Sequence, residues 1–398
     1  MSETAQSQVN IGLVGHVDSG KTTIVKALTG KWADTHSEEL KRGITIRLGY
    51  ADLAIRECPK CNMITAEETC TKCGGKTKVK RRVSFVDAPG HETLMTVMIS
   101  SSAIMDGAML IIAANEPCPQ PQTYEHFKAL EIMGIKKVVV VQNKIDLVSK
   151  KDALQNYKEI KKFLKGTFAE NAPIVPIAAH QKINLDQLCK TIEEHIPTPQ
   201  RDNKKPVMMF TARSFDVNKP GTKIQKMAGG VIGGSIIQGE LKKGDQIELR
   251  PGIKIDGEWK IIQTEIESIN VCNKEVKKAS PGGLAGVRTT LDPSLTKSDT
   301  LVGNICGKPD ALPPVMKELT LEAELMDRVI GMEEVKPLKP NEPLVVTTGT
   351  AMTIGTVSSL HPLKIKLKNP VCADKGWKAS LSRLIGNRWR LVGHGKIV

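Results

Sequence analysis

A glycine-rich loop near the N-terminus constrains the fold of this chain more than any other segment. It matches the pattern G-x-x-x-x-G-K-[ST] with the residues Gly15, His16, Val17, Asp18, Ser19, Gly20, Lys21 and Thr22. An apolar run, residues 9–14, precedes the loop, and a helical run, residues 22–28, follows it. In this strand–loop–helix order, backbone N–H groups and the helix N-terminus converge on phosphate oxygens. We therefore predict that the loop binds phosphate, with Lys21 reaching the β- and γ-phosphates and the Thr22 hydroxyl as a ligand of Mg²⁺.

A second motif, N-K-x-D at residues 143–146, predicts which base is bound. It follows the apolar run 137–141. A carboxylate at Asp146 can accept two N–H bonds from the N1 and N2 edge of guanine, whereas adenine would leave it desolvated and unpaired. Asn and Asp are common in turns, so the motif gains its weight from its place after a strand. We predict GTP or GDP as the ligand, held here by Asn143, Lys144 and Asp146.

Two further segments complete the expected site. Residues 87–91, Asp-Ala-Pro-Gly-His, close a third apolar run. Asp87 can hold Mg²⁺ through water, and the Gly90 backbone N–H can reach a γ-phosphate. In residues 42–46, Arg-Gly-Ile-Thr-Ile, the hydroxyl of Thr45 is a candidate second ligand of Mg²⁺.

Hydrolysis of GTP needs a water molecule in line with the γ-phosphate. His91 is the candidate to position that water; the alternative is a histidine at a helix N-terminus that is satisfied by the backbone. No arginine is placed to act on the phosphates from within the chain. We therefore expect slow intrinsic turnover and an external activator.

The first 200 residues alternate between apolar, strand-like runs and helical patterns, which predicts an open, doubly wound α/β sheet. The expected strands are residues 9–14, 83–86, 108–114, 137–141 and 174–178, and the helical patterns that separate most of them include 92–102, 122–133, 151–165 and 185–195. All of these strands except 108–114 run into a proposed nucleotide loop, and ligands of such sheets bind at the carboxyl ends of strands. A sixth strand, residues 48–56, should pair antiparallel with 83–86.

Beyond a stiff polar linker at residues 197–206, the helical periodicity disappears. Short β-rich runs recur between Gly and Pro turns, with a break near 309–314, which predicts two β-barrels. We therefore expect a P-loop GTPase domain followed by two all-β barrel domains. The expected boundaries are 1–200, with an insertion at 56–75, then 206–312 and 313–398.

The insertion carries two C-x-x-C pairs, formed by Cys58, Cys61, Cys70 and Cys73. Paired C-x-x-C turns place four thiolates in a tetrahedron, which predicts a structural Zn²⁺. The alternatives are four free thiols or two disulfides, and a cytosolic chain disfavours disulfides. The basic run 76–82 that follows could contact nucleic acid, or its charges could only keep a long strand solvated.

The chain has a formal net charge of +14, and residues 351–398 alone carry nine basic residues and one acidic residue. This excess indicates a polyanionic partner such as nucleic acid, with solubility as the alternative. Only four tryptophans, three tyrosines and six phenylalanines are present, which suits a protein that reads shape and backbone rather than stacked bases. The sequence has no run of 18 apolar residues and a polar start, so we expect a cytoplasmic protein without a membrane span.

The four nucleotide motifs, in this order, resemble those of the translational GTPases. The segments 35–43, 115–123 and 213–221, together with the cysteine pairs, are similar to the gamma-subunit family of heterotrimeric translation initiation factor 2, with an archaeal character. The resemblance covers essentially the whole chain. It departs at two places. Ser19 stands where the family usually has His, and Ala178-Ala179-His180 stand where Ser-Ala-Leu is usual.

The resemblance implies further contacts and partners. The segment 178–180 should complete the guanine pocket, with the Ala179 amide facing the guanine oxygen, and Asp18 and the Gly43 backbone should bind a second metal. GTP should close residues 30–46 and 87–100 and create a site for methionylated initiator tRNA. An alpha subunit on the second domain, a beta subunit on the first and the small ribosomal subunit are the implied protein and ribosome partners.

Two other kinds of protein also fit the nucleotide motifs: a selenocysteine-specific elongation factor and the GTPase subunit of a sulfate-activating enzyme. The former should carry an extra C-terminal domain, and the latter would need neither the cysteine pairs nor the basic last domain. A purely structural zinc and RNA-binding module would leave N-K-x-D unexplained.

Overall fold

A computed structural model of the chain describes residues 6–30, 49–87, 95–326 and 335–398. Its contacts divide the chain into two units, Met1–Pro199 and Gln200–Val398. Four of the expected site residues, Gly43, Thr45, Gly90 and His91, lie outside the described residues. Within the described ranges, none of the helices is both long and apolar enough to cross a membrane.

The first unit is built on a seven-stranded sheet of order β3-β2-β4-β1-β5-β6-β7. Its elements are β1 (Val9–Gly15), α1 (Lys21–Thr29), β2 (Gly49–Glu57), β3 (Ile64–Thr65), β4 (Lys78–Asp87), α3 (Met95–Ser102), β5 (Gly107–Ala113), α4 (Pro121–Met133), β6 (Val138–Asn143), α5 (Lys150–Leu164), β7 (Ile174–Pro176) and α6 (Leu185–His195). The strands β4, β1, β5, β6 and β7 run parallel, while β2 pairs antiparallel with β4, as expected. β1, β5 and β6 are buried along their whole length, which is why they read as continuous apolar runs.

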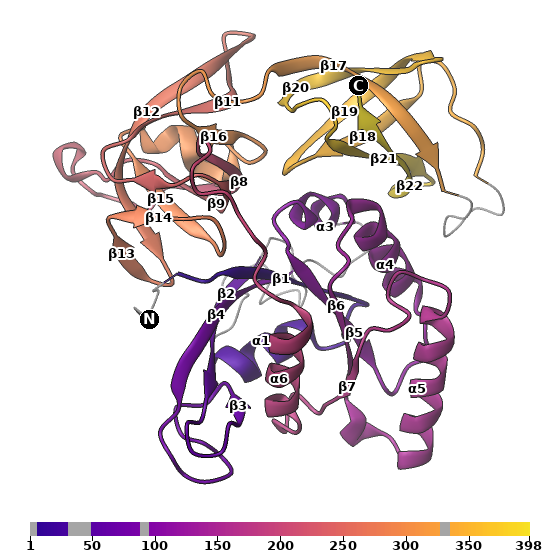
Figure 1. Ribbon diagram of the computed structural model, residues 1–398. Helices are drawn as coiled ribbons and strands as arrows, with labels where there is room; N and C mark the ends of the chain where they lie inside the picture. The colour runs from indigo at the N-terminus through magenta and orange to yellow at the C-terminus, as the bar shows by residue number, and fades with distance from the viewer. Residues whose placement is uncertain (1–5, 31–48, 88–94, 327–334) are drawn as a thin grey trace. The chain divides into compact units, whose positions relative to one another are not determined.

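Helices cover the sheet of the first unit on both sides (Figure 1). One apolar core joins α1 and α6 to alternate residues of the parallel strands, among them Ile11, Phe85 and Val139. On the other side, α4 packs against β1 and β5 and also against α3. This confirms the doubly wound sheet.

The carboxyl ends of the parallel strands meet at one edge of the sheet. The strand register pairs Leu13 with Asp87 and Gly15 with Ile111, so β1 ends two residues beyond the end of β4. Asn143 pairs with Ala113, so β6 ends two residues further on in the same direction. β7 ends at Pro176, two residues earlier than expected, and Ala178 instead forms an isolated antiparallel bridge with Ile183. This edge therefore carries the described loops that the sequence assigns to nucleotide binding.

The second unit begins with an antiparallel barrel. Its strands are β8 (Met208–Phe215), β9 (Val231–Gln238), β10 (Leu241–Lys242), β11 (Gln246–Ile255), β12 (Glu258–Val271), β13 (Lys274–Val276), β14 (Lys278–Ala279), β15 (Ala285–Thr289) and β16 (Ile305–Gly307). The main sheet has the order β11-β16-β8-β9-β15-β12-β13, and an additional pairing of β11 with β12 closes it on itself. The strands alternate between buried and exposed residues around a core that includes Ile232, Leu249 and Ile266.

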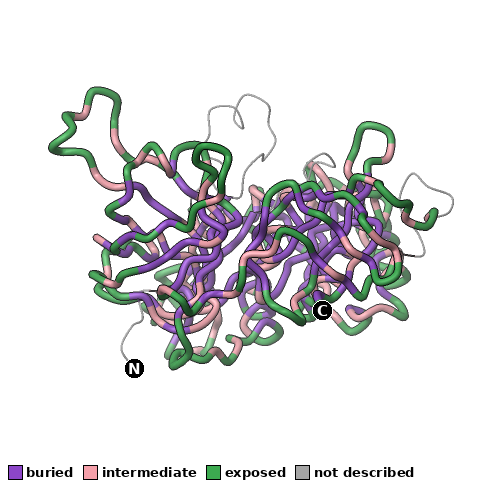
Figure 2. The backbone as a smooth tube through the Cα atoms, turned by 90° about the horizontal axis from the view of Figure 1, so that it is seen from above, coloured by how far each residue is buried: buried purple, intermediate pink, exposed green. Residues whose placement is uncertain are grey.

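A second closed barrel, of order β17-β20-β19-β18-β21-β22, completes this unit. Its strands are β17 (Val315–Leu325), β18 (Pro343–Thr348), β19 (Ala351–Leu360), β20 (Leu363–Cys372), β21 (Lys378–Ile385) and β22 (Arg388–Ile397). Buried residues follow the strands, whereas the connecting loops are largely exposed (Figure 2). The two barrels confirm the all-β expectation for this half of the chain.

Three long strands, β12, β19 and β21, were not expected from the sequence. Small or hydroxyl-bearing side chains are buried along these strands, such as Ser380 and Ser382 of β21, Thr353 of β19 and Thr264 of β12. Because these residues are polar in isolation, the alternation of apolar and polar residues is weak in the sequence.

Candidate nucleotide site and cysteine centre

The phosphate-binding loop connects the end of β1 to the start of α1 and is closed by its own side chains. The Lys21 ammonium donates to the carbonyl oxygens of His16 at 2.7 Å and Gly15 at 3.2 Å, and its side chain is nearly buried. The Ser19 hydroxyl, fully buried, donates to the same His16 carbonyl at 2.9 Å. A cation is thus held inside a turn that ends at a helix N-terminus, an arrangement suited to phosphate.

Side chains of helix α4 accept hydrogen bonds from the backbone of this loop. The Gly15 N–H donates to His126 Nδ1 at 3.1 Å, and the Val17 N–H donates to Gln122 Oε1 at 3.2 Å. The pKa of His126 is lowered to about 3, because the ring is buried and because Lys21 and His16 lie nearby. The neutral ring can therefore accept a hydrogen bond. The sequence analysis missed both residues; two hydrogen-bonding side chains four positions apart, on one face of the helix, were the available signal.

Asn143 connects three of the predicted segments. Its Nδ2 donates to the Ser19 carbonyl at 2.9 Å, and its Oδ1 accepts from the Ala179 N–H at 3.2 Å. Gly20 has a φ of +95°, and a Cβ there would lie 2.3 Å from Asn143 Nδ2, so only glycine fits. The Ala179 amide, expected to face a guanine oxygen, here joins its loop to the end of β6.

Asp146, the residue expected to bind the guanine edge, lies on a 3₁₀ turn, Ile145–Leu147, and is exposed. Its Oδ2 accepts from Gln181 Nε2 at 3.2 Å. Lys144 before it adopts a left-handed φ of 62°. Ala178 is buried and His180 is exposed in the same loop as Gln181. The two loops predicted to hold the base are therefore neighbours, with the carboxylate accessible from solvent.

Thr22 and Asp87, predicted to hold Mg²⁺, lie together. The Thr22 hydroxyl, at the second residue of α1, donates to Asp87 Oδ2 at 2.7 Å, and Asp87 is fully buried at the last position of β4. A hydroxyl and a carboxylate are the hard oxygen ligands that Mg²⁺ prefers, so this donor set fits the ion. Asp18, the predicted second-metal residue, is exposed with a φ of 60°.

The four predicted zinc ligands converge at the tip of the β2–β4 hairpin. All four sulfur atoms lie within 4.8 Å of one another, with Cys58 and Cys73 at 3.4 Å and Cys61 and Cys70 at 3.5 Å. A tetrahedral Zn²⁺ with Zn–S bonds of about 2.3 Å requires sulfur separations of roughly 3.8 Å. The cysteines are free thiols, so the disulfide alternative does not describe this structure.

The two cysteine turns share one backbone pattern. The N–H four residues after the first cysteine of each pair donates back to its carbonyl, from Asn62 to Cys58 at 2.8 Å and from Gly74 to Cys70 at 2.9 Å. Burial opposes ionisation of Cys58, but hydrogen bonds from the Lys60 and Cys61 amides outweigh it and lower the pKa to about 6. In the same cluster the Met63 amide favours the thiolate of Cys61, but hydrogen bonds with the neighbouring thiols and burial together outweigh it and raise the pKa to about 12. The fit to Zn²⁺ therefore rests on the four converging sulfur atoms.

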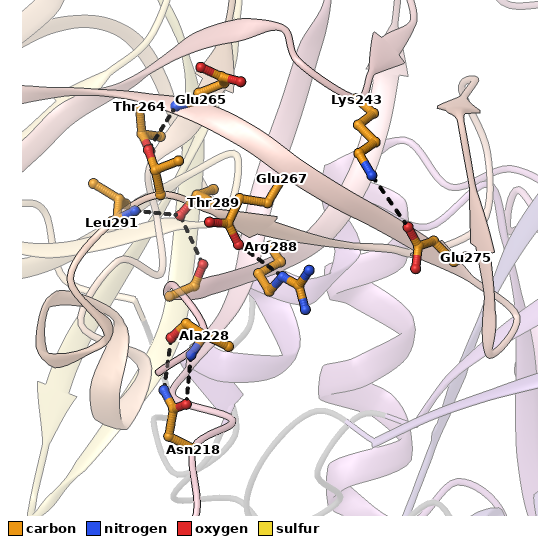
Figure 3. A network of polar contacts seen from close by, with 12 residues as sticks. Asn218, Ala228, Lys243, Thr264, Glu265, Glu267, Glu275, Arg288, Thr289 and Leu291 are labelled. Atoms are coloured by element: carbon orange, nitrogen blue, oxygen red, sulfur yellow. Dashed lines mark hydrogen bonds and ion pairs between the residues drawn. The ribbon is translucent and has the colours of Figure 1, made fainter. Parts of the chain in front are cut away.

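A loop of the first barrel, residues 216–228, is fastened at its base. Asn218 Nδ2 donates to the Ala228 carbonyl, and the Ala228 N–H donates to Asn218 Oδ1, each at 2.8 Å (Figure 3). Ile224 within this loop is 86% exposed. Other large apolar side chains exposed in or beside the loop are Phe215, Val217 and Met227. The loop is thus preformed and presents apolar surface.

Comparison with known families divides the chain into three matching regions. Residues 6–198 match the family described as "Elongation factor Tu GTP binding domain", and residues 229–306 match "Elongation factor Tu domain 2". Residues 317–397 match "Initiation factor eIF2 gamma, C terminal".

Curated relatives are similar along the whole chain. "Translation initiation factor 2 subunit gamma" of Archaeoglobus fulgidus is 56% identical, covering 100% of this chain and 96% of that protein. The protein of the same name from Methanocaldococcus jannaschii is 55% identical, covering 99% of this chain and 98% of that protein.

Among solved structures, a bacterial selenocysteine-specific elongation factor EF-Sec superposes with a TM-score of 0.76 at 26% identity, covering 98% of this chain and 58% of that one. The elongation factor SelB of Methanococcus maripaludis, in complex with a GTP analogue, superposes with a TM-score of 0.73 at 22% identity, covering 98% of this chain and 79% of that one. The latter similarity concerns the fold alone.

Proposed function

The chain belongs to the gamma-subunit family of translation initiation factor 2, and we propose that its GTP state binds methionylated initiator tRNA and delivers it to the small ribosomal subunit. Family membership makes the chain a translation initiation factor GTPase that binds GTP and GDP. The observation that carries the proposal is the 56% identity to an initiation factor 2 gamma subunit across 100% of the chain. Release would follow GTP hydrolysis, and the role would be exercised in the cytoplasm.

The loops at the sheet edge have separate tasks in this proposal. Lys21 and the N-terminus of α1 bind the phosphates, and Asp146 accepts hydrogen bonds from guanine. Thr22 and Asp87 would hold Mg²⁺, which neutralises phosphate charge when it is bound. The contact of 2.7 Å between the Thr22 hydroxyl and Asp87 supports a shared metal site.

We assign His91 to positioning the attacking water, on the strength of its place four residues after Asp87. A residue that acts on the transition state changes the hydrolysis rate more than nucleotide affinity. His91→Ala should therefore slow stimulated GTP hydrolysis while the dissociation constant for GTP barely changes. An equal loss of rate and affinity would instead support a packing role for the ring.

The partners belong to the proposal as well. An alpha subunit on the first barrel is supported by the loop 216–228, which is preformed by Asn218 and exposes Ile224. A beta subunit would bind the first unit. The basic excess of the last barrel supports contacts with RNA phosphates, and such contacts make binding strongly salt-dependent because counterions are released.

The alternatives are less well supported. The curated relatives at 54–56% identity carry the name of the initiation factor subunit, and the last barrel matches the initiation factor family. The similarity to EF-Sec, at 26% identity, reflects a common translational GTPase architecture.

A filter-binding experiment with the assembled factor tests tRNA carriage. Charged initiator tRNA and charged elongator tRNA are each titrated in the presence of GTP or GDP. We expect a preference for initiator tRNA, and an affinity that falls roughly 5- to 150-fold when GDP replaces GTP, the range typical of two-state coupling. Equal binding of both tRNAs, without dependence on the nucleotide, would exclude the carrier role and leave the GTPase assignment intact.

A further inference from the structure

We propose that Gln122 and His126 of α4 are positioning residues of the nucleotide site, which slow the release of GDP and GTP by fixing two peptide groups of the phosphate-binding loop. The two side chains stand four residues apart, so they lie on the same face of the helix. They accept the Val17 and Gly15 amides at 3.2 and 3.1 Å respectively. Both are positioning residues because their contacts are with the backbone of the loop.

The peptide group between His16 and Val17 is held at both ends. Its carbonyl accepts from the Lys21 ammonium at 2.7 Å and from the Ser19 hydroxyl at 2.9 Å, while its N–H donates to Gln122. A peptide group is planar, so a rotation that moves one end also moves the other. Gln122 therefore opposes a rotation that would pull this carbonyl away from Lys21 and turn it toward the phosphates.

The hydrogen bond between the Gly15 N–H and His126 lies in the interior of the first unit. Gly15 lies at the end of a strand whose residues are all buried, and the His126 side chain is only 1% exposed. If the acceptor is lost, water has little access to the Gly15 N–H, so the donor stays unsatisfied in the folded protein. A shift of the loop would let this N–H find another partner, but it would also displace the other groups of the loop that bind the phosphates.

The ring must be neutral to play this part. Accepting from Gly15 at Nδ1 puts the proton on Nε2, and a charged ring would carry protons on both nitrogens and face Lys21. The lowered pKa of His126, caused first by burial and then by Lys21 and His16, keeps the ring neutral in the physiological range. A side chain with a fixed acceptor at the place of Nδ1 should therefore substitute for it.

Two amide substitutions at His126 distinguish the loss of the hydrogen-bond acceptor from the loss of the volume of the ring. The Oδ1 atom of His126→Asn falls near the place of Nδ1, whereas the amide of His126→Gln reaches toward the place of Nε2. Dissociation rates of fluorescent GDP and GTP are measured by chase with unlabelled nucleotide, together with single-turnover hydrolysis of bound GTP. Lys128→Met is the matched control on the same helix, because the Lys128 ammonium pairs with Glu131 of α4 at 2.6 Å, away from the phosphate-binding loop.

We expect His126→Gln to raise both dissociation rates by the same factor, about 5- to 150-fold, which is the cost of one buried unsatisfied donor expressed as a rate ratio. His126→Asn should release both nucleotides at close to the wild-type rate. In both variants, the rate at which bound GTP is hydrolysed should stay unchanged. Equal defects in His126→Asn and His126→Gln, or unchanged release in His126→Gln, would overturn the proposal.

Gln122→Met provides a second measurement if His126→Gln does not fold. It removes the acceptor of the Val17 amide and keeps a side chain of similar length. Faster release of both nucleotides supports the proposal. Release at the wild-type rate, in protein with an unaltered unfolding temperature, overturns it.

Discussion

The nucleotide loops and the cysteine centre are both built from turns, but they are held in different ways. The nucleotide loops start from buried strand ends and are tied to one another by side chains, with Asn143 bonded to both Ser19 and Ala179. The cysteine turns close on themselves through their own backbone and four thiols. A side-chain hydrogen bond from the Thr71 hydroxyl to Asp186, at 3.1 Å, connects them to helix α6. We therefore expect a substitution in one nucleotide loop to disturb the other loops as well, and a substitution in the cysteine centre to have a local effect.

The largest effect should come from Asn143→Ala, which removes the tie between three loops. The substitution leaves the Ser19 carbonyl and the Ala179 amide without their partner, and each buried unsatisfied group costs about 1–3 kcal/mol. We expect nucleotide affinity and the free energy of unfolding both to fall. Titration with fluorescent GDP and urea unfolding without nucleotide measure the two losses.

Asn156→Ala is the matched control for this prediction. Asn156 is buried to the same degree, 4% exposed against 3% for Asn143, and it also makes two hydrogen bonds, with Gln142 and with the Glu116 carbonyl. It should cost similar stability but far less nucleotide affinity. Equal losses of GDP affinity in the two variants would mean that Asn143 contributes only through general stability.

The next largest effect concerns the base. Asp146→Asn should weaken GDP binding roughly 10- to 150-fold, the cost of losing a hydrogen bond to a charged group, and should favour xanthosine nucleotides, whose altered edge suits an amide. Competition titrations with GDP, XDP and ADP measure the exchange of preference. Wild-type protein that binds ADP as tightly as GDP would contradict the assignment of this pocket.

The two sites also differ in what the sequence could predict. Gly15 to Thr22 and the cysteine pairs are contiguous motifs, so their chemistry can be read from spacing. His126 could not be found this way, because its role depends on helix α4 passing beneath a loop more than a hundred residues away in the chain. The barrels were predicted from turn signals, yet β21 was missed because two of its buried residues, Ser380 and Ser382, are polar and interrupt the apolar run.

A smaller effect should appear in the pH dependence of folding. His126 has a pKa of about 3 in the folded protein, against an ordinary value of 6.5. Between these values the unfolded chain binds more protons, so the free energy of unfolding rises with pH. The contribution is fully present above pH 6.5 and is lost progressively as the pH falls toward 3. Between pH 7 and pH 5.5 the loss should be about 1 kcal/mol.

Urea unfolding of wild type and His126→Asn at both pH values isolates this contribution, since the other histidines are common to the two proteins. The variant should lose less stability than wild type over the same interval. Identical pH dependence in the two proteins would show that His126 does not enter the folded state as a buried neutral ring.

The smallest effect on nucleotide binding should come from Cys58→Ser, because the cysteine centre is closed locally. Metal analysis of wild-type protein purified without chelator should give about one zinc per chain, and the variant should lose it. Structural zinc contributes to local folding, so amide exchange should accelerate within residues 56–78 of the hairpin. GDP affinity should stay within about twofold of wild type, less than the effect of one net hydrogen bond. A zinc content near zero in wild type with intact thiols would exclude the metal. A large loss of GDP affinity in Cys58→Ser would mean that the Thr71–Asp186 contact, through α6, couples the cysteine centre to the guanine loop.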